Sequence, residues 1–96
     1  MDALKRFDTA EYNGVAIVVV ESDLLPPDPA VVVIPLLAEY PAIRHLNPEA
    51  THRGRRLILA ARLVAAVRRS RLHHAGSAAE QGDEITRAVD VLMGGI

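Results

Sequence analysis

Residues 15–36 read Val-Ala-Ile-Val-Val-Val-Glu-Ser-Asp-Leu-Leu-Pro-Pro-Asp-Pro-Ala-Val-Val-Val-Ile-Pro-Leu, and this stretch decides the fold. Its two apolar runs, Val15–Val20 and Val31–Ile34, are rich in β-branched side chains, which is typical of buried strands. The three prolines around Asp28 exclude regular structure between the runs. We therefore expect two strands that form a hairpin with a stiff loop at its tip.

The segments next to this hairpin give signals of unequal strength. Asn13-Gly14 is a tight-turn signal, so the residues before it are predicted to pair back as a first strand. Prolines divide residues 36–46 into short turns or a brief helix. The Ala, Leu and Arg content of residues 57–72 favours a helix, although patches of this segment alternate as a strand would.

The C-terminal segment predicts an amphipathic helix. Acidic residues at 83 and 84 suit its first turn, and the glycines at 94 and 95 would end it. Gly76-Ser77, upstream, is interpreted as a loop. The apolar positions recur at intervals of three and four, which marks one helix face; they are Ile85, Ala88, Val89, Leu92, Met93 and Ile96.

Length and composition predict one small domain that spans residues 1–96. Half of the 96 residues are hydrophobic and none is cysteine, so neither disulfides nor thiolate-bound metal can brace the core. A chain of this size buries only about 60–65% of its unfolded surface, and dimerisation is the remaining common way to bury more. Because neither a membrane span nor a signal peptide is apparent, we expect a cytoplasmic protein without membrane association.

Charge is segregated along the chain although the net charge is only −1. Residues 50–79 carry seven arginines and no acid, whereas the segments on both sides are acidic. Such a stretch could attract a phosphate backbone or an acidic peptide. The alternative is a solvated face that the protein's own acids balance.

Residue chemistry argues against an enzyme. No elbow motif surrounds Ser22, Ser70 or Ser77, as a nucleophilic serine would require. His73 and His74 are adjacent and lack a ligand-spaced partner, so we expect no metal site. A glycine-rich phosphate loop is absent, and three aromatic residues are too few for stacking nucleic-acid bases. An interaction protein without a cofactor is favoured.

Three stretches together resemble the CcdB family of bacterial toxins. The first is residues 20–36, which have Ser-Asp and two aliphatic residues before a loop and Val-Ile-Pro-Leu after it, as the family does. The second is Leu46-Asn47-Pro48, which resembles the family's Leu-Tyr-Pro before a central strand. The third is residues 85–96, which resemble the family's closing helix that ends in Trp-Gly-Ile. The resemblance implies a mainly β fold: a small bent antiparallel sheet, an SH3-like barrel of the CcdB/PemK type, with one C-terminal helix. It also implies two strands between residues 55 and 72, with a bend near Ala65-Ala66.

The resemblance implies a toxin of a toxin–antitoxin system that serves plasmid maintenance. Family members bind the A subunit of DNA gyrase and trap the complex in which DNA is cleaved, so DNA is reached only indirectly. Carried over by position, the gyrase-binding residues are Leu24, Leu25, Asp90, Met93, Gly94, Gly95 and Ile96. Structural alternatives are that the two leucines cap the sheet core, that the glycines only end the helix, and that Asp90 and Met93 belong to a dimer or core surface.

The chain departs from the family at the residue that anchors gyrase. Gly94 stands in the position of the family's tryptophan, and Met93 in that of a phenylalanine. Removing an anchor of this kind costs about 2–4 kcal/mol of binding. We therefore expect weakened poisoning, a divergent gyrase pocket or a different target.

The resemblance also implies partners. Family toxins are homodimers, and a CcdA-like antitoxin with an acidic tail neutralises them and represses the operon with them. The arginine-rich stretch could receive that tail through Arg53, Arg55, Arg62, Arg68 and Arg69. Two alternatives remain open: an endoribonuclease toxin of the MazF/PemK kind, which shares the fold, and a non-catalytic basic module that binds nucleic acid.

Overall fold

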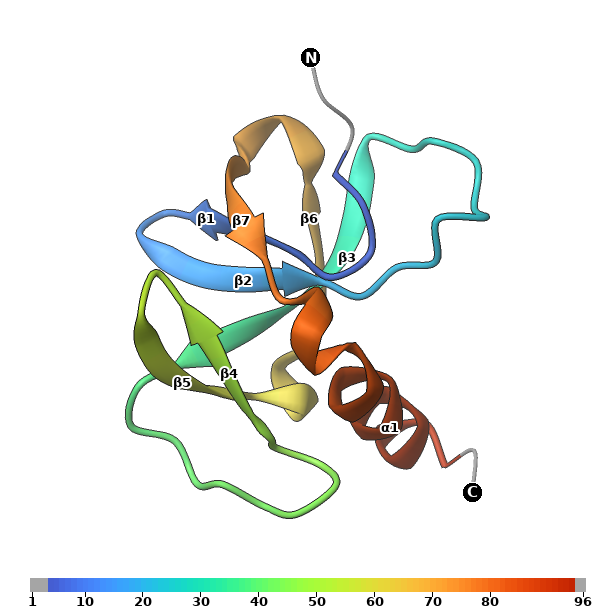
Figure 1. Ribbon diagram of the computed structural model, residues 1–96. Helices are drawn as coiled ribbons and strands as arrows, with labels where there is room; N and C mark the ends of the chain where they lie inside the picture. The colour runs from blue at the N-terminus through green and yellow to red at the C-terminus, as the bar shows by residue number, and fades with distance from the viewer. Residues whose placement is uncertain (1–3, 95–96) are drawn as a thin grey trace.

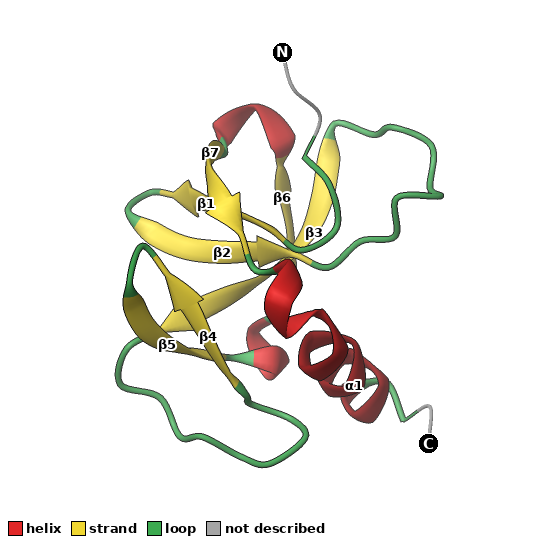
Figure 2. Ribbon diagram, viewed as in Figure 1, coloured by secondary structure: helices red, strands yellow, loops and turns green. Residues whose placement is uncertain are grey.

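A curled antiparallel sheet of seven strands, with one C-terminal α-helix packed against it, makes up the protein (Figure 1). The structure is a computed structural model that describes residues 4–94. Short 3-10 turns connect some of the elements (Figure 2). The elements are β1 (Asp8–Tyr12), β2 (Val15–Val19), β3 (Ala30–Leu37), β4 (Glu49–His52), β5 (Arg55–Leu59), η1 (Ala61–Leu63), β6 (Ala65–Arg68), η2 (Arg69–Arg71), β7 (His73–Ser77), η3 (Ala79–Gln81) and α1 (Gly82–Leu92).

The predicted mainly β fold with a single C-terminal helix is confirmed. The sheet order is β4-β5-β3-β2-β1-β7, and β6 pairs with β3 outside this path. Asn13 and Gly14 have φ values of 50° and 79°, the left-handed pair that a two-residue hairpin turn needs, and they join β1 to β2 as predicted. The predicted hairpin of β2 and β3 is also present, with Val18 opposite Ile34.

Strand β3 is longer than the sequence predicted and belongs to both halves of the sheet. Its first residues pair with β6, and Leu36 and Leu37 pair with β5. The turns or brief helix expected over residues 36–46 are therefore wrong at their start, because Leu36 and Leu37 continue the strand. The rest of that segment is a loop with one isolated bridge, between Ile43 and Asn47.

Residues 55–72 form two strands, as the resemblance implied, and not the helix that composition favoured. The break between the two strands lies at η1, a few residues before the bend expected near Ala65-Ala66. The last contact of the first strand with β3 is the hydrogen bond from the Ala60 N–H to the Pro35 carbonyl, and the chain turns directly after it. One other expectation was wrong: Gly76-Ser77 is not a loop but the end of β7, which pairs with β1. Strand β4, which follows Leu46-Asn47-Pro48, lies at the edge of the sheet.

The core consists of two apolar clusters, and alternate side chains of β2 and β3 point into one or the other. Val18 and Ile34 face the cluster that α1 covers, whereas Val19 and Val33 face the other. Helix α1 contributes buried residues at the predicted spacing, including Ile85. Met93 does not share that buried face, since 74% of it is exposed. No helix among the described residues is long and apolar enough to cross a membrane.

Candidate functional site

The loop after β2 carries two leucines that the core does not use. Leu24 is 94% exposed and Leu25 is 55% exposed, so neither caps the sheet core. The loop is ordered by a tight turn in which the Leu24 N–H donates to Ser22 Oγ over 3.1 Å. Asp23 accepts a hydrogen bond from the Arg6 N–H at 2.8 Å, which attaches the loop to the N-terminal segment.

The end of α1 is the second exposed part of the site inferred from the resemblance. Asp90 and Met93 are exposed, and Gly94 ends the helix with φ at 75° while its N–H donates to the Val91 carbonyl. Gly94 therefore does end the helix. Gly95 and Ile96 lie outside the described residues. In Figure 1 the loop after β2 and the end of α1 both project on the right of the view.

Arg6 and Phe7 connect this loop to α1, and sequence reasoning missed them. Arg6 Nη2 donates to Thr86 Oγ1 of α1 at 3.0 Å, while its main-chain N–H reaches Asp23. Phe7 packs against the cluster that α1 covers, and its ring lies against Gly82. A lone arginine near the N-terminus carries no motif, so only the folded contacts identify it.

The arginines expected to receive an acidic tail are dispersed over the fold. Arg53 and Arg55 lie on the β4–β5 hairpin, Arg62 lies in η1, and Arg68 and Arg69 lie at the junction of β6 and η2. The exposed side chains of Arg55, Arg62 and Arg68 form no ion pair within residues 4–94. Of the five arginines, these three have charge available for a partner.

Two of the five arginines already serve the protein's own structure. Arg53 Nη1 lies 3.7 Å from Glu11 Oε2. Arg69 Nε donates to the Asp28 carbonyl at 3.1 Å, and its Nη2 lies 3.7 Å from Glu21 Oε2. Arg69 thus fixes the proline loop after β2 against the end of β6.

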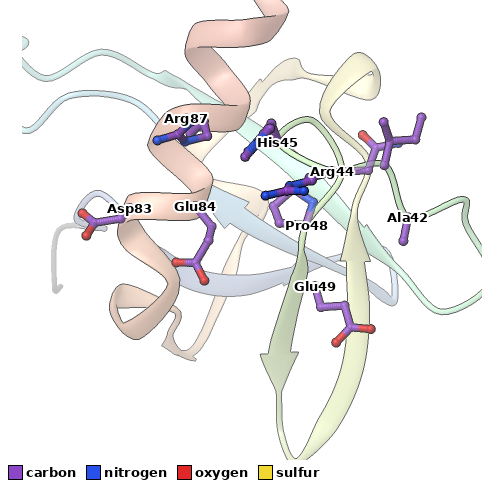
Figure 3. Close-up of a pocket in the computed structure, with 10 residues that line it drawn as sticks. Ala42, Arg44, His45, Pro48, Glu49, Asp83, Glu84 and Arg87 are labelled. Atoms are coloured by element: carbon purple, nitrogen blue, oxygen red, sulfur yellow. The ribbon is translucent and has the colours of Figure 1, made fainter.

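A pocket of about 680 Å³ lies between the loop before β4 and the first turns of α1 (Figure 3). The basic residues Arg44 and Arg87 line it together with His45 and the acids Glu49, Asp83 and Glu84. Of these acids, Glu49 is paired with Arg56 at 2.7 Å, and its hydrogen bonds and charge raise the pKa of Arg56. The pocket combines charges of both signs and can receive a polar surface, but it holds no nucleophile beside a base.

Two histidines lie beside carboxylates: His74, which is exposed and has its Nε2 3.5 Å from Asp8 Oδ2, and His52. Its Nε2 lies 3.4 Å from Glu11 Oε2, the same oxygen that Arg53 approaches. Only 6% of His52 is exposed, and its carboxylate partner is shared with the arginine. This imidazole is therefore placed to stabilise the contact between β4 and β1 and not to meet a polynucleotide. No group of three or more metal-binding side chains occurs within the part of the chain that the structure describes.

Comparison with protein-family models identifies the family of this chain. The family model described as CcdB protein matches residues 6–95, nearly the whole chain. The match includes the loop after β2, the arginine-rich stretch and α1. No curated protein matches the sequence.

Proposed function

The chain belongs to the CcdB family and is thus a toxin of a toxin–antitoxin system, and from that premise we propose that it binds the A subunit of DNA gyrase and stabilises the complex with cleaved DNA. The proposal rests on the exposure of Leu24, Leu25 and Met93, at the positions that match the family's gyrase-binding residues. Apolar side chains that the core does not bury gain free energy only when a partner desolvates them.

We propose that the contact is weaker than in members that carry tryptophan. Gly94 offers no side chain, and Met93 is the apolar group that remains at the described end of the helix. The protein acts by binding and not by catalysis in this proposal, because the site consists of leucine, methionine, glycine and one aspartate.

The proposed antitoxin is CcdA-like, with an acidic tail. Support comes from Arg55, Arg62 and Arg68, whose charges are not paired within residues 4–94. A homodimer is proposed as well. Leu63 and Val64 are exposed apolar residues next to β6, whose assigned strand partner is β3 alone. A second copy could cover this surface and add to a core that is small for independent stability.

Calorimetric titration against the gyrase A subunit of the same organism tests the proposal. We expect binding by the wild-type chain and a loss of affinity in Leu24→Ser and Met93→Ser. Ile43→Ser is the matched control, because Ile43 is also an exposed apolar residue but lies in the loop before β4. Equal losses in all three variants would reject the proposed surface, and the absence of any binding by the wild type would reject gyrase as the target.

A further inference from the structure

Arg6 occupies the junction between the two parts of the proposed gyrase-binding surface. Its main-chain N–H donates to Asp23 in the loop, and its side chain donates from Nη2 to Thr86 Oγ1 on α1, at 2.8 and 3.0 Å. The loop carries Leu24 and Leu25, α1 carries Asp90, and Met93 directly follows the helix. One residue therefore joins two segments that are far apart in the sequence.

Phe7 fixes the orientation of Arg6. The guanidinium carbon of Arg6 lies 4.8 Å from the centre of the Phe7 ring, a cation–π contact. Phe7 has φ of 72°, which is unfavourable for an aromatic residue, yet its N–H and carbonyl are bonded to Val19 and Ala78. Strained backbone of this kind persists where the surroundings determine it, and it is common where a side chain must be aimed.

The hydrogen-bonding capacity of the Arg6 side chain is only partly used, which is unexpected for a residue whose sole role is to stabilise the fold. Arg6 Nε is buried and has no hydrogen-bond partner within the described residues. Its guanidinium, moreover, is not among the groups that form ion pairs there. A buried donor without a partner is unfavourable for folding. A smaller apolar side chain would avoid that cost, so the contacts to Thr86 and to the Phe7 ring are the features that distinguish arginine here.

We propose that Arg6 is a positioning residue that holds the Ser22–Leu25 loop and α1 in one fixed relation, so that both parts of the gyrase-binding surface are presented together. The inference rests on the proposed function for the identity of that surface. Preorganisation of this kind raises affinity by removing the cost of ordering two segments on binding. With one hydrogen bond at stake, its loss should weaken gyrase binding by about 2- to 10-fold.

Spin labels test the positioning without any partner. The chain has no cysteine, so Leu24→Cys with Arg87→Cys gives one label on the loop and one on α1. An excess of unlabelled chain removes distances between copies. We expect a narrow distance distribution in the wild-type background, a broad one in Arg6→Met and Thr86→Val, and a narrow one again in Thr86→Ser, which keeps the hydroxyl acceptor.

A second label pair separates loss of positioning from loss of folding. Labels at Val15 and Arg55, both on the sheet, should keep their distribution in every variant. If Arg6→Met also broadens the distance distribution of this second pair, the variant has disturbed the fold. Thr86→Val then provides the test of positioning, since it removes only a single hydroxyl. Unchanged loop-to-helix distributions in Thr86→Val would overturn the proposal.

A double-mutant cycle on gyrase affinity distinguishes this inference from the proposed function. If Arg6 transmits the coupling, Asp23→Ala and Thr86→Val combined should lose no more affinity than either alone. Additive losses would overturn the positioning role while gyrase binding stands. If no form of the protein binds gyrase, the proposed function fails, and the label distances alone decide whether Arg6 positions the loop.

Discussion

Restoring an indole at position 94 is the sharpest perturbation of the proposed site. Gly94 ends α1 at φ of 75°, and among residues 4–92 no heavy atom lies within 4 Å of the place where a Cβ would be added. The substitution Gly94→Trp therefore meets backbone strain but no steric obstruction. We expect it to strengthen poisoning of a gyrase that tryptophan-bearing family members inhibit.

The two free-energy effects act on different equilibria. Strain at a left-handed position costs about 1–2 kcal/mol, and it is present in the free and the bound protein alike. It therefore lowers the free energy of unfolding and leaves the affinity unchanged. The indole adds about 150–250 Å² of contact area, or about 4–6 kcal/mol at about 25 cal/mol per Å². Measured anchors retain about 2–4 kcal/mol of this, which is roughly a 30- to 1000-fold gain in affinity.

Linearisation of supercoiled plasmid by gyrase is the assay, with the toxin titrated and the cleaved product quantified. Gly94→Ala is the matched control, because it introduces the same backbone strain without an aromatic ring. Thermal unfolding of all three proteins gives the folded fraction. We expect weak cleavage with wild type and Gly94→Ala, and strong cleavage with Gly94→Trp.

Two results would refute this reasoning. Strong cleavage by the wild type would show that the indole is dispensable and that the leucines and Met93 suffice. No gain from Gly94→Trp, with folding intact, would show that the pocket for tryptophan is not part of this protein's target.

Three further predictions concern the fold, the assembly and the antitoxin. Ile85→Ala should lower the free energy of unfolding by about 2–5 kcal/mol in a denaturant titration, since Ile85 is 1% exposed, whereas Val91→Ala, at an exposed position, should change it by less than about 0.5 kcal/mol. Sedimentation equilibrium should give twice the mass of one chain, and a compact monomer at micromolar concentration would contradict the proposed dimer. Arg62→Ala with Arg68→Ala should weaken binding of an acidic antitoxin peptide and flatten its salt dependence, and an unchanged salt slope would exclude these two arginines.

Local sequence predicted those parts of the fold that local chemistry determines. Asn13-Gly14 specified a hairpin because few residue pairs adopt left-handed φ so readily, and the spacing of Ile85 and Ala88 specified a buried helix face. Residues 57–72 were misread from composition because Ala, Leu and Arg favour helix, while pairing with β3 made strands of two parts of this segment. Long-range pairing of this kind leaves no local signal.

The sequence proposed the residues of the candidate site but not the contacts that support them. Resemblance pointed to Leu24 and Met93, and both are exposed. Arg6 has its effect through Asp23 and Thr86, which are 17 and 80 residues away in sequence. Contacts over such separations depend on the completed fold, so sequence periodicity could not reveal them.

Strand β3 has a consequence for how the chain emerges during synthesis. β1, β2 and β3 can pair as soon as they are synthesised. The edge of β3 that does not face β2 stays unpaired until β5 and β6, which begin at Arg55 and Ala65, have been synthesised. During that interval an apolar edge is open to pairing with other chains. Pro35 lies within this edge and has no N–H to donate, so it interrupts the ladder that an intruding strand would need. We expect Pro35→Val to increase aggregation of nascent chains more than it changes the stability of the finished protein.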